Sequence, residues 1–365
     1  MRLAAAVPEQ AVSGLRCSEN RKEQDKQMKK ERLFYLDFVR AAATLLIVLT
    51  HYNALFLYTN PQMPEKSVLG LTFSRVYIGD LGVSLFLIIS GASLMYVYKK
   101  ACNLRIYFKK RFWGIYPMFW LGYAVFFFYN FYQNRGLTPG IPKYRIIYSI
   151  LGLDMYAQAF GQVNFAVVGE WFLGMIILFY PFFPLLRKWA LSHPVSLAAA
   201  SAVLYAAFLI WPNPYNSIIL PVLLPRIIFG MLFIQSGKKV RWPAALISAG
   251  IIVLNSILPI QIDSTLQATY IGIAVFLILV WLADFLRWIP FRRICGWICK
   301  YSYAIFIVHH TIIFLVTEKF DLYSLTRFNS YLLFLCCCCV IFVAAYLLQK
   351  VHDRAVAIFR VNKKE

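Results

Sequence analysis

The sequence predicts an all-α protein, a polytopic bundle of about ten transmembrane helices with both termini in the cytoplasm. Three observations lead to this prediction. Hydrophobic residues make up 61% of the 365 residues and charged residues only 15%, whereas soluble domains carry about 25% charged residues. Apolar runs of about 20 residues, long enough to cross a hydrocarbon core of about 30 Å, recur along the chain. Lysine and arginine gather between alternate runs.

The predicted spans follow one another with boundaries that are soft by about one helical turn. They cover residues 33–58, 78–97, 112–132, 163–186, 195–212, 217–237, 243–260, 267–287, 294–316 and 329–349. Most of the 37 Lys and Arg lie in segments 1–32, 98–112, 187–193, 238–242, 287–293 and 350–365, which the positive-inside rule places in the cytoplasm. The opposite segments carry Lys66, Arg75, Arg135, Lys143, Arg145, Lys319 and Arg327.

Outside the spans the chain is short and polar. Residues 1–32 lack the apolar core of a signal peptide and are expected to form a cytoplasmic tail. A transmembrane domain is expected over 33–350 and a second cytoplasmic tail over 351–365. A short interfacial helix is expected within 143–153. The net charge of +21 is spread over several short segments, which indicates a membrane face rather than a nucleic-acid partner. The sequence leaves the oligomeric state open.

The eight cysteines indicate no metal site. Cys336–Cys339 are consecutive and point all around a helix, while Cys295 and Cys299 share one face without further ligands near them in sequence. Zinc sites need about four converging ligands. The sequence therefore predicts no metal site.

The first span places ionisable residues inside an apolar helix. Arg40 and His51 are eleven residues apart, about three turns plus 20°, so they share one face with Asp37 and Thr44. Charged groups inside a membrane cost at least about 2.5–3.5 kcal/mol, so they face protein or water and mark functional sites by default. The stripe indicates an internal cavity. For Asp37 and Arg40 the alternative is an ion pair that only anchors the helix.

Three other spans carry ionisable groups at the depth of His51. Counted at 1.5 Å per residue, Glu170, Arg226, His309 and its neighbour His310 lie about 10–14 Å below the outer surface. A shared depth is what a buried polar chamber requires. Pairing of Glu170 with Arg226 would avoid an unpaired charge at that depth, and a purely structural ion pair is the alternative.

Several motifs, in matching order from about Leu33 to Ile313, resemble the acyltransferase-3 family of membrane acyltransferases. They are Leu36-Asp37-x-x-Arg40 followed by His51, GVSLFLIISG with Ser90 and Gly91, KKRFWGIYPMFW, GEWFL with Trp171, Arg226 before Phe229-Gly230, and Ser302-Tyr303 before His309. The sequence departs from the family pattern at Ala92, where Phe is usual, and at Gly114, where a second Arg is common. The second departure leaves any phosphate role in the basic segment to Arg111 or Lys109.

The resemblance implies an O-acetyltransferase-like enzyme in a bacterial plasma membrane. It would move an acyl group, expected to be acetyl, from cytoplasmic acyl-CoA to a hydroxyl of a cell-surface or lipid-linked glycan. Acyl-CoA would be a substrate, not a bound cofactor. The implied residues are His51, Glu170 and His309 for catalysis, Asp37, Arg40, Ser90, Gly91, Lys109, Lys110 and Arg111 for the donor, and Trp171 and Arg226 for the acceptor. His51 could act as general base or as transient acyl carrier.

A membrane transporter or flippase for a glycan precursor or small anion is the alternative function. Such proteins also bury charge at mid-depth, usually with inverted repeats and with broken helices in matching halves. No convincing repeat relates the first five predicted spans to the last five, which favours the enzyme.

Overall fold

The computed structural model describes residues 33–211, 214–237, 239–259 and 261–361, and most of these are helical. The described helices are α2 (Phe34–Leu57), α3 (Ile78–Tyr98), α4 (Leu104–Gln133), α5 (Ile146–Leu151), α6 (Asp154–Ala159), α7 (Trp171–Phe179), α8 (Phe183–Ser192), α9 (Pro194–Ile210), α10 (Leu220–Ser236), α11 (Trp242–Ile257), α12 (Ser264–Ala283), α13 (Ile289–Thr317) and α14 (Arg327–Val361). Short 3-10 helices η1 (Pro64–Lys66) and η2 (Lys143–Arg145) and a hairpin of β1 (Thr72–Phe73) and β2 (Val76–Tyr77) lie in the connections. The all-α prediction is confirmed.

Six of these helices are long and apolar enough to cross a membrane: α2, α3, α4, α12, α13 and α14. Together α7 and α8 also pass this criterion, but they are bent by 58° at a short break, and α9, α10 and α11 are shorter apolar helices. The chain is therefore a multi-pass membrane protein, as predicted. The count of ten spans is not confirmed.

Two segments that were predicted to be a loop and a tail are instead parts of helices. Helix α4 begins at Leu104, inside the segment expected as a cytoplasmic loop. The Asn103 side chain caps this first turn by accepting a hydrogen bond from the backbone N–H of Ile106 at 3.1 Å. Helix α14 runs on to Val361, through most of the expected C-terminal tail. The tails expected at 1–32 and 362–365 lie outside the described residues. The short helix expected within 143–153 is present as η2 and α5.

The predicted span over 163–186 is wrong as a continuous helix. Residues before Trp171 are not helical, and the chain breaks again between α7 and α8. Gly169 has a φ of +76°, a left-handed conformation that interrupts a helix. Pro181 stands in the second break and lacks the N–H that a continuous helix would use.

Helix α3 is the centre of the packing and contacts α10 most extensively, then α2 and α12. The α3–α10 crossing is close because a glycine on each helix faces the partner's backbone. A Cβ atom at Gly91 would lie 1.9 Å from the carbonyl oxygen of Ile227, and one at Gly230 would lie 1.9 Å from that of Ile88. Membrane helices associate largely through such close packing at small residues. The crossing therefore fixes α3 against α10.

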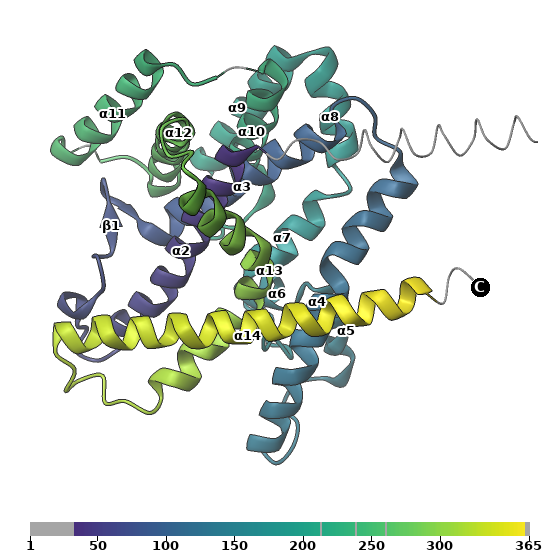
Figure 1. Cartoon of the computed structure of the whole chain (residues 1–365), viewed down its shortest axis with the longest axis vertical. Coiled ribbons are helices and arrows are strands. Elements are labelled where there is room, and N and C mark those ends of the chain that lie inside the picture. Colours follow the sequence, from purple (N-terminus) through teal and green to yellow (C-terminus); the bar gives the residue numbers. More distant parts are fainter. Residues whose placement is uncertain (1–32, 212–213, 238, 260, 362–365) are drawn as a thin grey trace, which may run out of the picture. The chain divides into compact units, whose positions relative to one another are not determined.

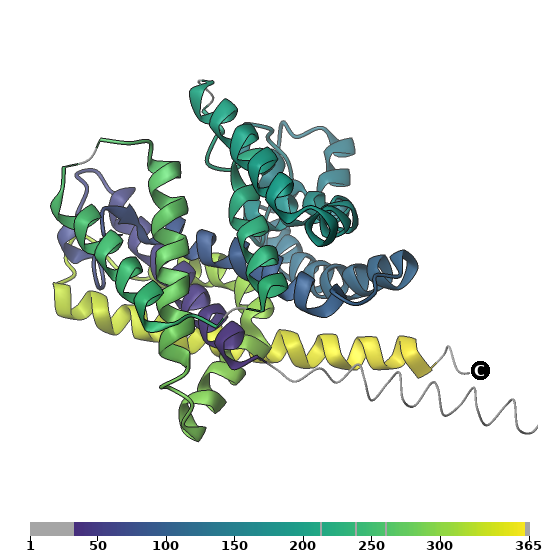
Figure 2. The same cartoon turned by 90° about the horizontal axis from the view of Figure 1, so that it is seen from above.

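Helix α13 connects this centre to the C-terminal helix, since it packs against both α2 and α14. Figure 1 shows the long α14 passing across α13 and α4, and both pairs are in contact. The view turned by 90° in Figure 2 shows the C-terminal part of α14 continuing past α13. Helices α2, α3, α4, α7 and α13 supply the walls of the cavity described below.

We expect Gly91→Ala and Gly230→Ala each to lower the thermal stability of the protein. The added methyl group would overlap a backbone carbonyl, so the helices must separate, and overpacking of this kind typically costs about 1–3 kcal/mol. Thermal unfolding in detergent, followed by size-exclusion chromatography, measures the effect. Gly250→Ala on α11 is the control, because no atom lies within 4 Å of the added Cβ. Melting temperatures equal to wild type in both test variants would contradict the crossing.

Candidate functional site

A cavity of about 440 Å³ lies between α2, α3, α4, α7 and α13. Arg40 and His51 both line it. They are eleven residues apart on α2, so the cavity follows that helix for about 16 Å. The side chains near Arg40 are basic and polar, whereas those near His51 form an imidazole–carboxylate cluster. The cavity thus has two chemically different ends.

The basic end carries three cations, Arg40, Lys110 and Arg111. The Arg40 guanidinium donates a hydrogen bond to the Ser93 hydroxyl at 3.0 Å. The Arg111 guanidinium lies over the Tyr180 ring, 5.6 Å from its centroid, and its buried Nε has no hydrogen-bond partner within the described chain. Cations in a partly apolar cavity favour an anionic ligand, and guanidinium binds phosphate in a bidentate manner.

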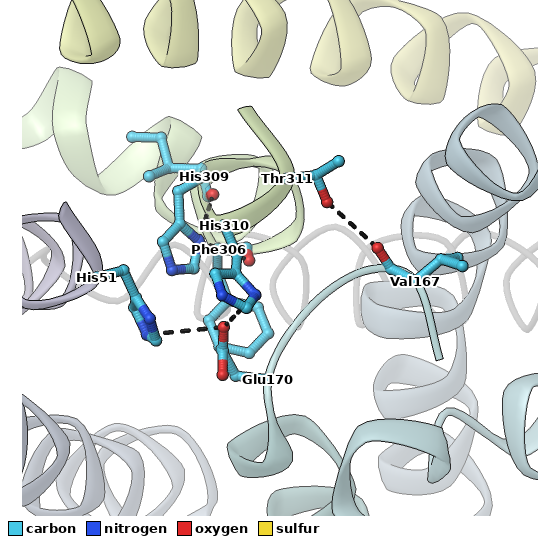
Figure 3. A network of polar contacts seen from close by, with 8 residues as sticks. His51, Val167, Glu170, Phe306, His309, His310 and Thr311 are labelled. Carbon is cyan, nitrogen blue, oxygen red and sulfur yellow. Dashed lines mark hydrogen bonds and ion pairs between the residues drawn. The ribbon is translucent and has the colours of Figure 1, made fainter. Parts of the chain in front are cut away.

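The other end brings four ionisable side chains together from three elements (Figure 3). Glu170, just before α7, places its Oε1 atom 3.1 Å from His310 Nδ1 and 3.6 Å from His51 Nε2. The His51 ring lies 4.9 Å from that of His309 and 5.0 Å from that of His310, centroid to centroid. The side chains of His51 and Glu170 are only 21% and 12% exposed. Charge that develops here is therefore poorly screened by water.

His309 is fully buried, and the backbone fixes its tautomer. Its Nδ1 atom lies 3.1 Å from the carbonyl oxygen of Ile305 and 3.0 Å from that of Phe306. Because a carbonyl only accepts hydrogen bonds, Nδ1 carries the proton and Nε2 is left as an acceptor. That Nε2 atom is buried, with no hydrogen-bond partner among the residues described. The cluster thus holds an unused acceptor that a ligand hydroxyl would satisfy.

Residues 33–350 match a family model described as an acyltransferase domain, Acyl_transf_3. The chain belongs to the acyltransferase-3 family. The match covers most of the chain, including both ends of the cavity, and establishes a membrane acyltransferase in general. Comparison with curated proteins gives no significant match, and neither does comparison with solved structures.

In this acyltransferase, Glu170 stands at the start of a helix and not inside one. It precedes the first residue of α7 in an extended conformation, with φ −142° and ψ 163°. The irregular segment before it is held by protein side chains: the Tyr123 hydroxyl donates to the Phe165 carbonyl at 2.7 Å, and the Thr311 hydroxyl donates to the Val167 carbonyl at 3.2 Å. Non-helical backbone is tolerated at membrane depth only where protein or water satisfies it in this way.

Asn164 and Asp154 support the same segment from the connection between α4 and α7. The Asn164 side chain accepts a hydrogen bond from the backbone N–H of Ala166 and donates to the carbonyl of Asp154, both at 2.9 Å. Asp154 is only 1% exposed. Because burial disfavours its charged form, it raises the pKa of the Asp154 carboxyl to about 7. The neutral form of this carboxyl is therefore more favoured than that of an exposed aspartate.

The cavity gathers most of the residues that the sequence singled out. Those that line it are Arg40, His51, Ser90, Lys110, Arg111, Glu170 and Trp171. His309 contacts the cluster through the His51 ring, 4.9 Å away between centroids, but is not among the lining residues. Lys109, Asp37 and Gly91 are not among the lining residues. Gly91 faces α10 instead, and the backbone carbonyl of Asp37 accepts a hydrogen bond from the Cys299 thiol at 3.0 Å.

The predicted pairing of Arg226 with Glu170 is wrong. Arg226 is 3% exposed on α10 and donates hydrogen bonds to the Thr269 hydroxyl at 2.9 Å and to the Thr265 carbonyl at 3.2 Å. Both partners belong to α12, and Arg226 does not line the cavity. A shared depth places two residues at the same height in the membrane, but it does not determine toward which helix each side chain points. The predicted pairing failed for this reason.

His310 is the residue that the sequence analysis underestimated. The family motif contains His309, and consecutive residues of a helix point about 100° apart. The structure places both imidazoles near His51, and His310 makes the shorter contact with Glu170. The sequence did contain a signal for His310. Two consecutive histidines lie at the depth of Glu170, so either imidazole could reach its carboxyl group.

The same cluster could also hold a metal ion. The ligand atoms of His51, Glu170 and His309 lie within 4.8 Å of one another. Tetrahedral zinc would hold such atoms roughly 3.3 Å apart, and side chains around a bound hydroxyl adopt similar spacings. The sequence predicts no metal, and the metal content of the purified protein would separate the two arrangements.

Proposed function

We propose that the protein transfers an acetyl group from cytoplasmic acetyl-CoA to a hydroxyl of a cell-surface or lipid-linked glycan. One observation carries this proposal: a single cavity is lined both by three cations and by the His51–Glu170 cluster, and Arg40 lies about 16 Å from His51 along α2. The cations suit the phosphates of coenzyme A, and an imidazole suits removal of a hydroxyl proton. The pantetheine arm would run between the two ends.

In the proposed reaction the acceptor oxygen attacks the thioester carbonyl carbon. A C–O bond forms, the C–S bond breaks, and the acceptor proton passes to the His51 imidazole. From there it reaches the leaving sulfur, so the products are the acetyl ester and coenzyme A thiol. Glu170, 3.6 Å from His51 Nε2, stabilises the imidazolium that forms. The contact of His310 with the same oxygen orients Glu170.

Transient acylation of His51 is the other route that an imidazole allows. Radiolabelled acetyl-CoA added without acceptor distinguishes the two routes. An acyl-enzyme would leave label on wild-type protein after rapid quenching, and general-base catalysis would leave none.

The acceptor end is proposed to bind a sugar ring. Trp171 directly follows Glu170 and lines the same cavity. An indole presents a large apolar face, which suits the apolar side of a sugar ring, while a carboxylate accepts hydrogen bonds from its hydroxyl groups. The positive-inside pattern would place the cationic end toward the cytoplasm and this end toward the exterior of a bacterial plasma membrane.

Purified protein and acetyl-CoA test the proposal. We expect release of coenzyme A thiol, faster when glycan acceptor is present, and transfer of labelled acetyl to the glycan fraction. A transporter or flippase would show neither. Mass spectrometry of cell-surface glycans with and without the protein would then identify the acceptor.

We expect Arg40→Ala and the double variant Lys110→Gln/Arg111→Gln to raise the apparent KM for acetyl-CoA by about 10–100-fold, since a hydrogen bond to a charged group contributes about 1.5–3 kcal/mol. The apparent KM for the acceptor should change much less. Arg105→Gln is the matched control, because this exposed cation lies on α4 but does not line the cavity. An unchanged donor KM combined with an altered topology would show that these charges only orient the chain.

A further inference from the structure

At the basic end of the cavity, Arg111 lies against a tyrosine ring and not against an acid. Its guanidinium carbon is 5.6 Å from the centroid of the Tyr180 ring, and both residues line the cavity. No salt bridge to Arg111 is present in the part of the chain that the structure describes. Its buried Nε atom also lacks a hydrogen-bond partner there. An aromatic face thus accompanies this cation where a carboxylate would usually stand.

Tyr180 is held in place by the same helix that carries Arg111. It follows the last residue of α7 and precedes Pro181, where the chain bends toward α8. The last carbonyl groups of a helix have no partner within it, and that of Tyr180 accepts a hydrogen bond from the Tyr107 hydroxyl at 3.0 Å. Tyr107 precedes Arg111 by four residues, about one turn of α4. Helix α4 therefore contacts both the backbone and the ring of Tyr180.

Further aromatic rings fix Tyr107 itself. It is fully buried, and its ring centroid lies 5.1 Å from that of Tyr98 at the end of α3 and 5.5 Å from that of Phe183 at the start of α8. The Tyr180 ring lies 6.5 Å from it in an edge-on arrangement. Close packing of this kind leaves side chains few alternative rotamers. The protein, and not a ligand, therefore determines where the Tyr180 ring lies.

An aromatic partner suits a cation that must bind an anion. A carboxylate would occupy the N–H groups of a guanidinium in a bidentate manner, so an incoming phosphate would have to displace it. A ring face attracts the cation through its quadrupole and leaves those N–H groups available. A side chain that is already ordered also loses less conformational freedom on binding. Arg111 is thus oriented toward the cavity without being neutralised.

We propose that Tyr180 is a positioning residue that holds the Arg111 guanidinium in place for a phosphate group of the donor. This inference rests on the proposed acyl transfer and adds a residue to its donor site. Tyr180 acts through Arg111, and its ring, not its hydroxyl group, carries the role.

Binding of coenzyme A to the purified protein, measured by isothermal titration calorimetry, tests the proposal without requiring turnover. Tyr180→Leu should raise the Kd about 2–10-fold, which is the usual cost of ordering one long side chain on binding. In an Arg111→Gln background the same change should leave the Kd unaltered, because the side chain that Tyr180 positions is gone. Tyr180→Phe keeps the ring and should bind as the wild type does.

Thiol release gives a second readout that a merely structural role would not produce. Tyr180→Leu should raise the KM for acetyl-CoA by the same factor as the Kd and leave kcat unchanged, since the His51 cluster lies at the other end of the cavity. Tyr346→Leu is the matched control. The Tyr346 ring also carries a cation, with Lys350 Nζ 5.3 Å from its centroid, but it does not line the cavity. Tyr180→Met serves if Tyr180→Leu does not fold.

The outcomes separate this inference from the proposed function. An unchanged Kd in folded Tyr180→Leu or Tyr180→Met protein would overturn the inference alone. So would an equal rise of the Kd in the Arg111→Gln background, because Tyr180 would then act by a route other than Arg111. A wild type that neither binds coenzyme A nor releases thiol from acetyl-CoA would overturn the proposed function, and the inference with it.

Discussion

Replacing His51 by alanine is expected to reduce acyl transfer by about 10²–10⁴-fold, the usual contribution of a positioned general base. The protein should still insert, accumulate and melt as the wild type does, because the His51 side chain faces the cavity and a smaller residue leaves the helix packing of α2 intact. Thiol release and label transfer measured at saturating acetyl-CoA give the change in kcat. The donor KM should change little, since the cations lie at the other end.

His193→Ala provides the control for this variant. His193 is an exposed imidazole between α8 and α9 and lies outside the cavity. More than about a tenth of wild-type activity in His51→Ala would rule out the general-base role, since the smallest effect typical of such a base is 10²-fold.

The second large effect is expected for Glu170→Gln. This change keeps the size of the side chain but replaces the carboxyl group whose Oε1 atom lies near both His51 and His310. We expect kcat for glycan transfer to fall by about 10²-fold, the lower end of acid–base effects, because Glu170 acts through the imidazolium that it stabilises. Slow thiol release without acceptor should persist, since the donor cations are untouched. Glu65→Gln, an exposed acid in η1, is the matched control.

Two alternatives give different results for Glu170. A purely structural role predicts that Glu170→Gln lowers protein yield and melting temperature along with activity. A metal role predicts that the purified enzyme contains a stoichiometric metal, loses activity with a chelator and regains it with zinc. Either pattern would contradict the acid–base proposal.

Two of the helices around the cavity follow closely from the sequence. The apolar runs predicted at 33–58 and 78–97 differ from α2 and α3 by at most one residue at each end, since few polar groups can lie within such runs without a partner. The proximity of His51, Glu170 and His309 was also expected from their common depth, and the structure places them together.

What the sequence did not predict depends on contacts between distant segments. The run VVGEWFLG has the composition of a helix interior, but side chains from α4 and α13 hold the backbone before Glu170 in an irregular conformation. Likewise, Arg226 finds its partners on α12, a neighbour that residue counting along one span does not reveal. The choice between His309 and His310 required the direction of Glu170, which only the packing of α7 against the bundle supplies.

The irregular segment that precedes Glu170 separates this residue in the chain from the other residues of the cavity. All three donor cations and His51 are carried by two continuous helices, α2 and α4, whereas Glu170 is attached to the 134–169 connection. If the proposed function holds, exchange of that connection should alter the choice of acceptor while leaving donor binding in place. For protein engineering, we expect chimaeras joined at residues 134 and 169 to be a direct route to new acceptors, provided that the hydrogen-bond donors Tyr123 and Thr311 are retained.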